Sequence, residues 1–521
     1  MLLRALVLLF FVQSIDPVLA QPDAHQAEQD PRIGRVLGTI SFPTSTQSPE
    51  AQAAFIEGML LLHLFEYPYA EAAFQRAQSL DPDFAMAYWG EAMVHNHPIW
   101  DEQDGDKARA VLAKFGGDEA AIEQRLKSDR ERDFFRSLFI LYGSDGSAKT
   151  KAARDLAYEQ HYAAMAERYP EDHEVQLFYA LSLMGTHAGV RDTIAYMEST
   201  AISQRVFYAN RQHPGAAHYL IHGVDDPIHA PLGLEAARAL YELAPDAGHS
   251  LHMTSHIFNA LGMWGDSVKA NINADRVADA MRAERGLAER KTGHYNFWLL
   301  YGLLQQNRVD EARDMLRAAY EELHAAGTEP GARMILDPDR DALGSLVQMW
   351  ARFLFETGGV DADIMKWEFA TAGAFDPTLT ILYARGLLSQ SRDGVAAHLE
   401  DFRATKAELE AAIKAQERIA PSELEYLERL EVIEQQLLAN LARVEGRNAD
   451  ALDHAREASR IEGDMPFSFG PPFVDYPSAQ LLGEIAAEQG FREEAIAAFR
   501  EQLRRSRNRR QAKDGLAALL P

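Results

Sequence analysis

The stretch FIEGMLLLHLFEYPYAEAAFQRAQSLDPDFAMAYWG, residues 55–90, decides how this chain folds. Its apolar residues recur at intervals of three and four, which predicts α-helices and not strands. Small residues, one aromatic residue and a proline stand at fixed places within it: Gly58, Ala70, Phe74, Ala77 and Pro82. Small residues let two helices approach closely, the phenylalanine fills the space between them, and the proline ends the second helix. The stretch therefore predicts a pair of antiparallel helices.

This series of residues resembles the tetratricopeptide repeat (TPR), a unit of 34 residues that folds as helix–turn–helix. A second copy, LLGEIAAEQGFREEAIAAFREQL at residues 481–503, carries Gly483 and Phe499 at matching places, with Arg507 where the proline would stand. Weaker copies lie between the two. The resemblance implies an all-α fold, a right-handed TPR-like helical solenoid over residues 51–521, and the alternative is an irregular helical bundle.

The composition excludes several classes of function. The chain has 521 residues and a formal net charge of −26, so its surface repels phosphate backbones and we expect no nucleic-acid partner. It has no cysteine, which rules out disulfides, thiolate nucleophiles and cysteine-bound metals. Histidine, aspartate and glutamate are therefore the strong metal ligands that remain.

The N-terminal segment has the pattern of a secretory signal peptide over residues 1–20. Arg4 is followed by an apolar run at 5–12 and by the small-residue exit Val18-Leu19-Ala20. We therefore expect an exported protein, periplasmic or secreted, with a loose lead-in over residues 21–50. No later segment is long and apolar enough to predict a membrane span.

Histidines are concentrated in one region, because eight of the eighteen lie within residues 213–294. His218 and His222 are one helical turn apart, and so are His252 and His256. Each member of the second pair follows its counterpart by 34 residues, the length of one TPR unit. The resemblance to TPR proteins implies that both pairs lie on first helices of neighbouring repeats, which line the concave face. Three more histidines are expected nearby: His213, His249 and His294.

These histidines predict a site for a divalent transition metal. Imidazoles at i and i+4 often hold a metal, and a facing helix can complete the shell. The spacing does not distinguish Zn, Cu, Fe and Ni. Asp225, Asp226 and Asn259 are expected to add oxygen ligands or to orient the rings. In the alternative interpretation, each imidazole donates to a backbone carbonyl or packs in a polar groove.

A weaker pattern of the same kind lies upstream. His63 and His97 are also 34 residues apart, and Glu91 and His95 are one turn apart. They predict either a second polar site on the concave face or, more simply, a hydrogen-bonded cluster that lines the groove.

Several segments also resemble a narrower group of bacterial TPR proteins: SFPTSTQSPEAQAAFIEGMLLLHLF, LDPDFAMAYWGEAM, HPGAAHYLIH and HMTSHIF. This resemblance covers most of residues 41–275. It implies the helical-repeat fold and the paired-histidine segments, and it implies no reaction, substrate or metal.

Three functions are compatible with the sequence. The first is an exported TPR scaffold that binds a protein or peptide on its concave face and carries a histidine-rich metal site. The second is a metalloenzyme that uses the same histidines, and the third is a metal carrier or sensor. The sequence lacks HExxH, GxGxxG and GxSxG motifs, so no standard catalytic signature favours the second function.

Two further segments carry expectations of their own. The insert GDMPFSFGPPFVDYPS at residues 463–478 contains four prolines and four aromatic residues, so it should fold back onto the helices. It packs either between two repeats or across the concave groove. The basic run at residues 503–513 is expected on the solvated outer face of a terminal helix.

The signal pattern yields a direct prediction. The mature protein should begin near Gln21, because the small residues before it match a signal-peptidase site. Mass spectrometry of the protein purified from its native host checks this, and an intact Met1 would contradict it.

Overall fold

The computed structural model describes residues 35–143, 150–188, 191–326, 342–416 and 419–520. The chain divides into two units, Met1–Arg35 and Val36–Pro521, and the fold described here is that of the second unit. The predicted signal peptide over residues 1–20 lies outside the described residues, as do residues 21–34 of the lead-in, so these parts stay predictions. Residues 36–48 contain no helix or strand, and the first helix begins at Pro49.

The described part of the chain is α-helical almost throughout, as predicted, with two 3₁₀ turns and one pair of two-residue antiparallel strands. From the N-terminus the elements are α1 (Pro49–His63), α2 (Tyr67–Leu80), α3 (Ala85–Met93), β1 (Asn96–His97), η1 (Pro98–Trp100), β2 (Glu102–Gln103), α4 (Gly105–Phe115), α5 (Glu119–Glu123), α6 (Asp129–Tyr142), α7 (Lys151–Arg168), α8 (His173–Thr186), α9 (Thr193–Ala209), α10 (Pro214–Gly223), η2 (Ala230–Gly233), α11 (Leu234–Leu243), α12 (Gly248–Ala260) and α13 (Trp264–Glu284). The chain continues with α14 (His294–Gln305), α15 (Val309–Ala326), α16 (Ala342–Thr357), α17 (Ala362–Met365), α18 (Phe375–Leu388), α19 (Arg392–Lys414), α20 (Pro421–Val444), α21 (Asn448–Asp464), α22 (Ser478–Glu488), α23 (Arg492–Arg505) and α24 (Arg510–Leu519). Among the described residues, no helix combines the length and the apolarity that crossing a bilayer requires.

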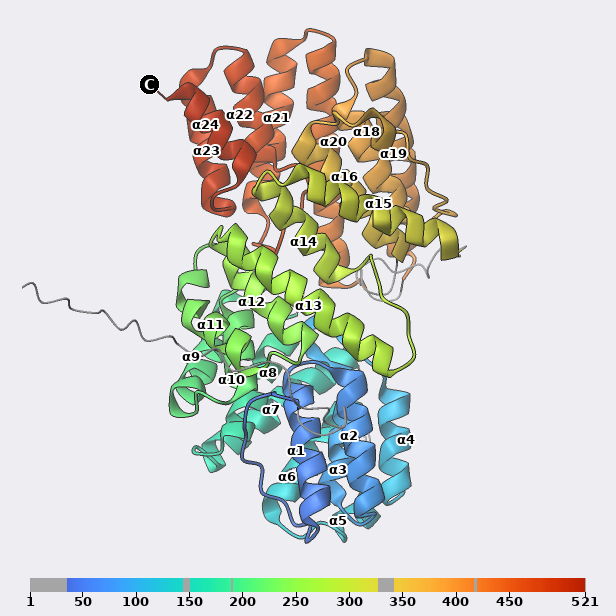
Figure 1. Ribbon diagram of the computed structural model, residues 1–521, viewed down its shortest axis with the longest axis vertical. Coiled ribbons are helices and arrows are strands. Elements are labelled where there is room, and N and C mark those ends of the chain that lie inside the picture. The colour runs from blue at the N-terminus through green and yellow to red at the C-terminus, as the bar shows by residue number, and fades with distance from the viewer. Residues whose placement is uncertain (1–34, 144–149, 189–190, 327–341, 417–418, 521) are drawn as a thin grey trace, which may run out of the picture. The chain divides into compact units, whose positions relative to one another are not determined.

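The helices form a succession of packed pairs, in the manner of TPR repeats. Neighbours in the chain pack on each other, as in α1 with α2, α12 with α13 and α20 with α21 (Figure 1). Alternate helices also touch: α8 packs on α10, α10 on α12, α16 on α18 and α20 on α22. First helices thus stack along the array, which is the arrangement that the repeat pattern predicted.

The phenylalanine of the repeat pattern is the wedge between helices. Phe74 of α2 lies between Gly58 of α1 and Gly90 of α3, where added Cβ atoms would be 2.6 Å and 2.3 Å from its ring. Phe499 of α23 occupies the same position between Gly483 and Gly515, with corresponding distances of 2.9 Å and 2.5 Å. The two sequence copies are therefore structural equivalents, and α23 ends at Arg505 although Arg507 replaces the proline.

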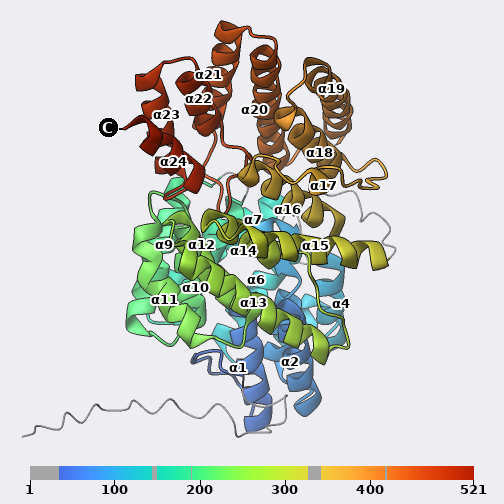
Figure 2. The ribbon, with the colours of Figure 1, turned by 45° about the horizontal axis from the view of Figure 1, so that its top comes forward.

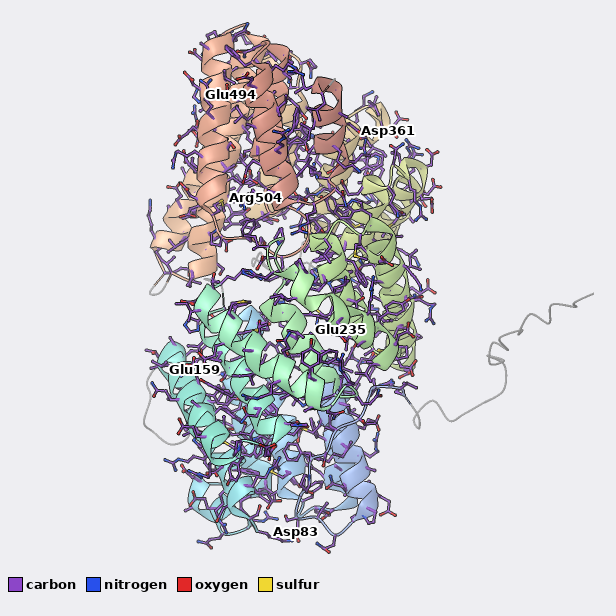
Figure 3. The ribbon with its side chains drawn as sticks, turned by 90° about the vertical axis from the view of Figure 1, so that its left-hand side faces the viewer. Asp83, Glu159, Glu235, Asp361, Glu494 and Arg504 are labelled. Carbon is purple, nitrogen blue, oxygen red and sulfur yellow. The ribbon has the colours of Figure 1, made fainter. Side chains whose placement is uncertain are left out.

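The apolar residues form two main cores within this unit. One extends from Leu37 to Ala270 and the other from Val268 to Ala512, so they adjoin at α13. In the first half α1 also packs against α10, although the eight α-helices α2 to α9 separate the two in the chain. Charged side chains such as Asp83 and Glu235 lie on the outside (Figure 3).

The C-terminal repeat closes the second half. Arg509, in the predicted basic run, is fully buried, pairs with Glu356 of α16 at 2.6 Å and donates to Tyr301 of α14. Arg510 donates to the backbone oxygen atoms of Leu304 and Glu356. The expectation that the basic run lies on a solvated outer face is thus wrong for these two residues, because α24 turns back onto α14 and α16.

The Pro- and Phe-rich insert crosses the inside of the second half. Arg352 of α16 donates to the backbone oxygen atoms of Pro472 and Asp475, and Arg429 of α20 donates to that of Phe473. Both guanidinium groups also bind the Asp475 carboxylate, at 2.7 Å and 2.8 Å. Figure 2 shows the segment between α21 and α22 descending toward α14. The insert, residues 465–477, therefore packs against α16 and α20 and not only between its adjacent helices, α21 and α22.

The wedge packing predicts that Gly90→Ala destabilises the protein. A methyl group at that position overlaps the Phe74 ring, and overpacking of this kind costs about 1–3 kcal/mol. Gly463→Ala is the matched control, because Gly463 is exposed in α21 and an added Cβ there meets no atom within 4 Å. Urea denaturation followed by circular dichroism should show a lower midpoint for Gly90→Ala alone. Equal midpoints for the two variants would contradict the wedge.

Candidate metal centre

Three successive first helices, α10, α12 and α14, bring six histidines together (Figure 1). Pro214 in the first turn of α10 sets where that helix begins, so that His218 and His222 fall on one face. The same periodicity on α12 aligns His249, His252 and His256, and His294 opens α14. The cluster lies where the first hydrophobic core meets the second.

The first group of imidazoles belongs to α10 and the start of α12. The Nε2 atoms of His218 and His222 are 3.1 Å apart, and the ring centres of His218 and His249 are 5.2 Å apart. One nitrogen of each of the three rings lies within 4.8 Å of the others. The Nε2 atom of His249 is buried and has no hydrogen-bond partner among the residues that the structure describes. We call this group the α10 triad.

The second group, the α12 triad, consists of His252, His256 and His294. The Nε2 atoms of His252 and His256 are 3.0 Å apart, and the rings of His252 and His294 have centres 4.5 Å apart. Here too one nitrogen from each ring lies within 4.8 Å of the others. The sequence predicted one meeting point for the two i, i+4 pairs. The structure instead gives each pair a separate third histidine, and the two triads lie side by side.

Hydrogen bonds at the outer nitrogens determine the tautomers of the α12 triad. His256 Nδ1 lies 2.5 Å from the Asp225 carboxylate, which can only accept, so it carries a proton. His252 Nδ1 lies 2.7 Å from Asn271 Oδ1, whose orientation follows from the bond of its own Nδ2 to the Ser267 carbonyl. Protonated at Nδ1 alone, the two rings present bare Nε2 lone pairs to each other at 3.0 Å. Such a contact is repulsive unless a proton or a metal ion lies between the two nitrogens.

Burial favours the neutral form of four of the six imidazoles, which is the form that binds a metal ion. Loss of hydration lowers the pKa of His218 to about 3, against an ordinary value of 6.5. Burial, reinforced by the neighbouring imidazoles, also lowers the pKa values of His222, His249 and His252 well below their usual range. His218 Nδ1 donates to the backbone oxygen of His63 at 2.7 Å, so its Nε2 is available as a ligand.

His213, which the sequence grouped with the metal ligands, lies in a different cluster. Its Nε2 is 3.2 Å from Glu174 Oε1, and His63 Nε2 is 2.8 Å from Glu174 Oε2. These three side chains can also hold a metal ion. However, both imidazoles can donate to the carboxylate, and Tyr219 can donate to His63 Nδ1, so the cluster is a connected hydrogen-bond network without one. Burial alone would raise the pKa of Glu174, but His63 and His213 overcome it and hold that pKa far below its usual range.

The other predicted polar residues have separate roles. Asp225 orients His256, whereas Asp226 accepts from His229 and pairs with Arg191. The upstream residues do not form one site: Glu91 accepts from Gln75, Gln78 and Lys114. His97 stacks on Tyr67, with ring centres 4.0 Å apart, whereas His63 binds Glu174.

Sequence reasoning missed several partners of the triads. Trp298 stands one turn after His294 and packs on His256, with ring centres 4.2 Å apart, and Phe469 of the insert lies 6.0 Å from the same ring. The i, i+4 spacing of His294 and Trp298 could have indicated that Trp298 lies beside the site. No local pattern points to Phe469 or Asn271, because both reach the site through tertiary packing.

The chain is similar to solved helical-repeat structures at low identity. No protein-family model and no curated protein sequence matches it. Yeast Tom70 is 12% identical over 91% of this chain and 89% of that chain, with a TM-score of 0.32. The APC/C hetero-tetramer Cut9–Hcn1 gives 11% over 90% and 76%, with a TM-score of 0.34. The TPR domain of P58(IPK) gives 12% over 90% and 97%, with a TM-score of 0.17. At these TM-scores the matches provide no evidence about the repeat packing beyond that described above, and none about the site.

The Glu174 network predicts a stabilising role for this residue. Glu174→Gln removes the charge that accepts from two buried imidazoles, and breaking a buried pair costs about 3 kcal/mol. Thermal unfolding should therefore begin at a lower temperature in the variant, while metal content stays that of the wild type. Loss of metal with an unchanged unfolding temperature would mean that this cluster is itself a metal site.

Proposed function

We propose that this protein binds a divalent transition metal through His252, His256 and His294. The observation that carries the proposal is the 3.0 Å contact between two Nε2 atoms whose rings are both protonated at Nδ1. A metal ion bound to both nitrogens turns this repulsion into coordination. A shared proton is the competing explanation, and it needs neither His294 nor a second triad beside it.

The surroundings of the triad support metal binding. Histidine ligands in metal sites commonly donate their second ring nitrogen to a carboxylate or another oxygen, which orients the ring and raises its basicity. Here Asp225 accepts from Nδ1 of His256, and Asn271 accepts from Nδ1 of His252. An all-imidazole site suits Zn, Cu, Fe or Ni, the four metals that the sequence left open.

A metal-dependent reaction is the second candidate, and one observation favours it. A cavity of about 60 Å³ lies between Asp225, Asn259 and the insert. Buried polar atoms of three lining residues have no hydrogen-bond partner within the described part of the chain: Asp225 Oδ1, Asn259 Nδ2 and Gln502 Oε1. A small polar molecule in this cavity would contact the carboxylate that orients His256. A carrier or sensor would need no such cavity.

The scaffold hypothesis is supported by the ability of the inner face of the second half to hold an extended segment. That face already holds an extended segment of the chain, because Arg352, Arg429 and Gln436 donate to backbone oxygen atoms of residues 472–476. A protein or peptide partner on this face would have to replace the insert. We therefore place metal binding first and partner binding second.

Metal analysis of the purified protein tests the proposal. We expect bound transition metal in the wild type, and His252→Ala should weaken binding by more than the roughly 10–100-fold that loss of an outer partner costs. His294→Ala should act in the same direction with less effect on folding, because His294 is only partly buried at a helix start. Inductively coupled plasma mass spectrometry after dialysis gives the metal content.

His454→Ala is the matched control for these variants. His454 lies in α21, and its Nδ1 is 2.8 Å from Gln435 Oε1, away from both triads. It should retain full metal content. A wild-type protein that takes up no metal would leave the shared proton as the explanation for the His252–His256 contact.

A further inference from the structure

The two triads are close enough to influence each other. The ring centres of His222 and His256 are 6.2 Å apart, and those of His249 and His252 are also 6.2 Å apart. An unbroken series of imidazoles thus runs from the α10 triad to the α12 triad. Each triad offers three nitrogens within 4.8 Å, so each can hold an ion of its own.

The charges behind the two triads differ. The α12 triad has the Asp225 carboxylate hydrogen-bonded to one of its ligands. The α10 triad has a neutral carbonyl behind His218, and Glu66 accepts from the backbone N–H of His249 and not from its ring. The positive charge of Arg191 also acts on His222. A cation is therefore better stabilised in the α12 triad.

Burial increases the effect of this charge difference on the affinities of the two triads. Charges in a protein interior interact more strongly than in water, and the repulsion between two ions grows with the product of their charges. Two dications side by side repel each other four times as strongly as two monocations at the same separation. The two carboxylates beside the six imidazoles, Asp225 on a ring nitrogen and Glu66 on a backbone N–H, compensate only part of the charge of two dications.

We propose that the two triads form a two-ion centre with graded affinities. The α12 triad binds the first ion, and the affinity of the α10 triad for a second ion decreases as the charge of the ions increases. A second dication binds weakly, whereas two Cu(I) ions bind with similar affinities, because imidazole suits copper and the repulsion is small. The proposal rests on the proposed metal binding at the α12 triad and extends it to the neighbouring site.

Titration of the full-length protein with Zn²⁺, and with Cu(I) under anaerobic reducing conditions, tests the grading. Competition with a chromophoric chelator gives both the stoichiometry and the affinities. We expect one tight Zn²⁺ and a second at least 100-fold weaker, but two Cu(I) within about tenfold of each other. Two Zn²⁺ of equal affinity, or a single Cu(I), would overturn the proposal while leaving metal binding intact. No bound metal at all would overturn the proposed function itself.

Two variants assign the ions to their triads. His249→Ala removes a ligand only from the α10 triad, and should abolish the second Cu(I) while leaving the first Zn²⁺ unchanged. Asp225→Asn should lower the affinity of the first Zn²⁺ by about 10–100-fold, the usual effect of changing a group behind a ligand. Asp226→Asn is its control, because Asp226 binds His229 and Arg191 and no triad ring.

The outcomes for the variants separate the order of filling from the existence of the centre. Loss of the tight Zn²⁺ in His249→Ala would show that the α10 triad fills first, which overturns the assigned order. Equal effects of Asp225→Asn and Asp226→Asn would show that the hydrogen bond to His256 does not favour the first site. Circular dichroism of each apo variant identifies any that fails to fold, and His222→Ala then replaces His249→Ala.

Discussion

A polar atom that leaves water must find a partner inside the protein, and this constraint governs the interior of the whole chain. Stacked helix pairs bury an inner face, and this face is rich in charged and polar side chains as well as apolar ones. Arg352 and Arg429 meet Asp475, and Arg509 meets Glu356. Each of these pairs joins segments far apart in the chain, so that satisfying the charges also decides which helices lie together.

The second half of the repeat array is organised around such pairs. The insert at residues 465–477 has too many prolines to form a helix, and its backbone oxygen atoms would be unsatisfied in an apolar groove. The guanidinium groups of Arg352 and Arg429 and the amide of Gln436 bind those oxygens. As a result Met465 and Val474 of the insert join the second core, and the ring centre of the exposed Phe469 lies 6.0 Å from that of His256 in the first half.

The histidine clusters show what one carboxylate changes. Around Glu174 the two imidazoles face an acceptor, so both of their Nε2 atoms are satisfied by protein atoms, and only His213 Nδ1 has no hydrogen-bond partner among the described residues. In the α12 triad the carboxylate of Asp225 binds the outer nitrogen of His256 and does not lie between two rings. The Nε2 atoms of His252 and His256 therefore face each other directly. The same residue types thus form a structural network in one place and a ligand set in the other. The position of the carboxylate makes the difference.

The sequence by itself determined the features that depend on local spacing. Helical periodicity places His218 with His222 and His252 with His256 on one face each, and the 34-residue interval places both pairs on successive first helices. The small and aromatic residues of the repeat likewise predict the wedge of Phe74, because the helix contacts recur with the repeat. Only the tertiary structure decided that each pair gains its own third histidine, that His213 joins Glu174, and that Arg509 is buried. These outcomes depend on how far-separated helices turn toward one another and on which buried charges meet, and neither is encoded in the spacing of residues along the chain.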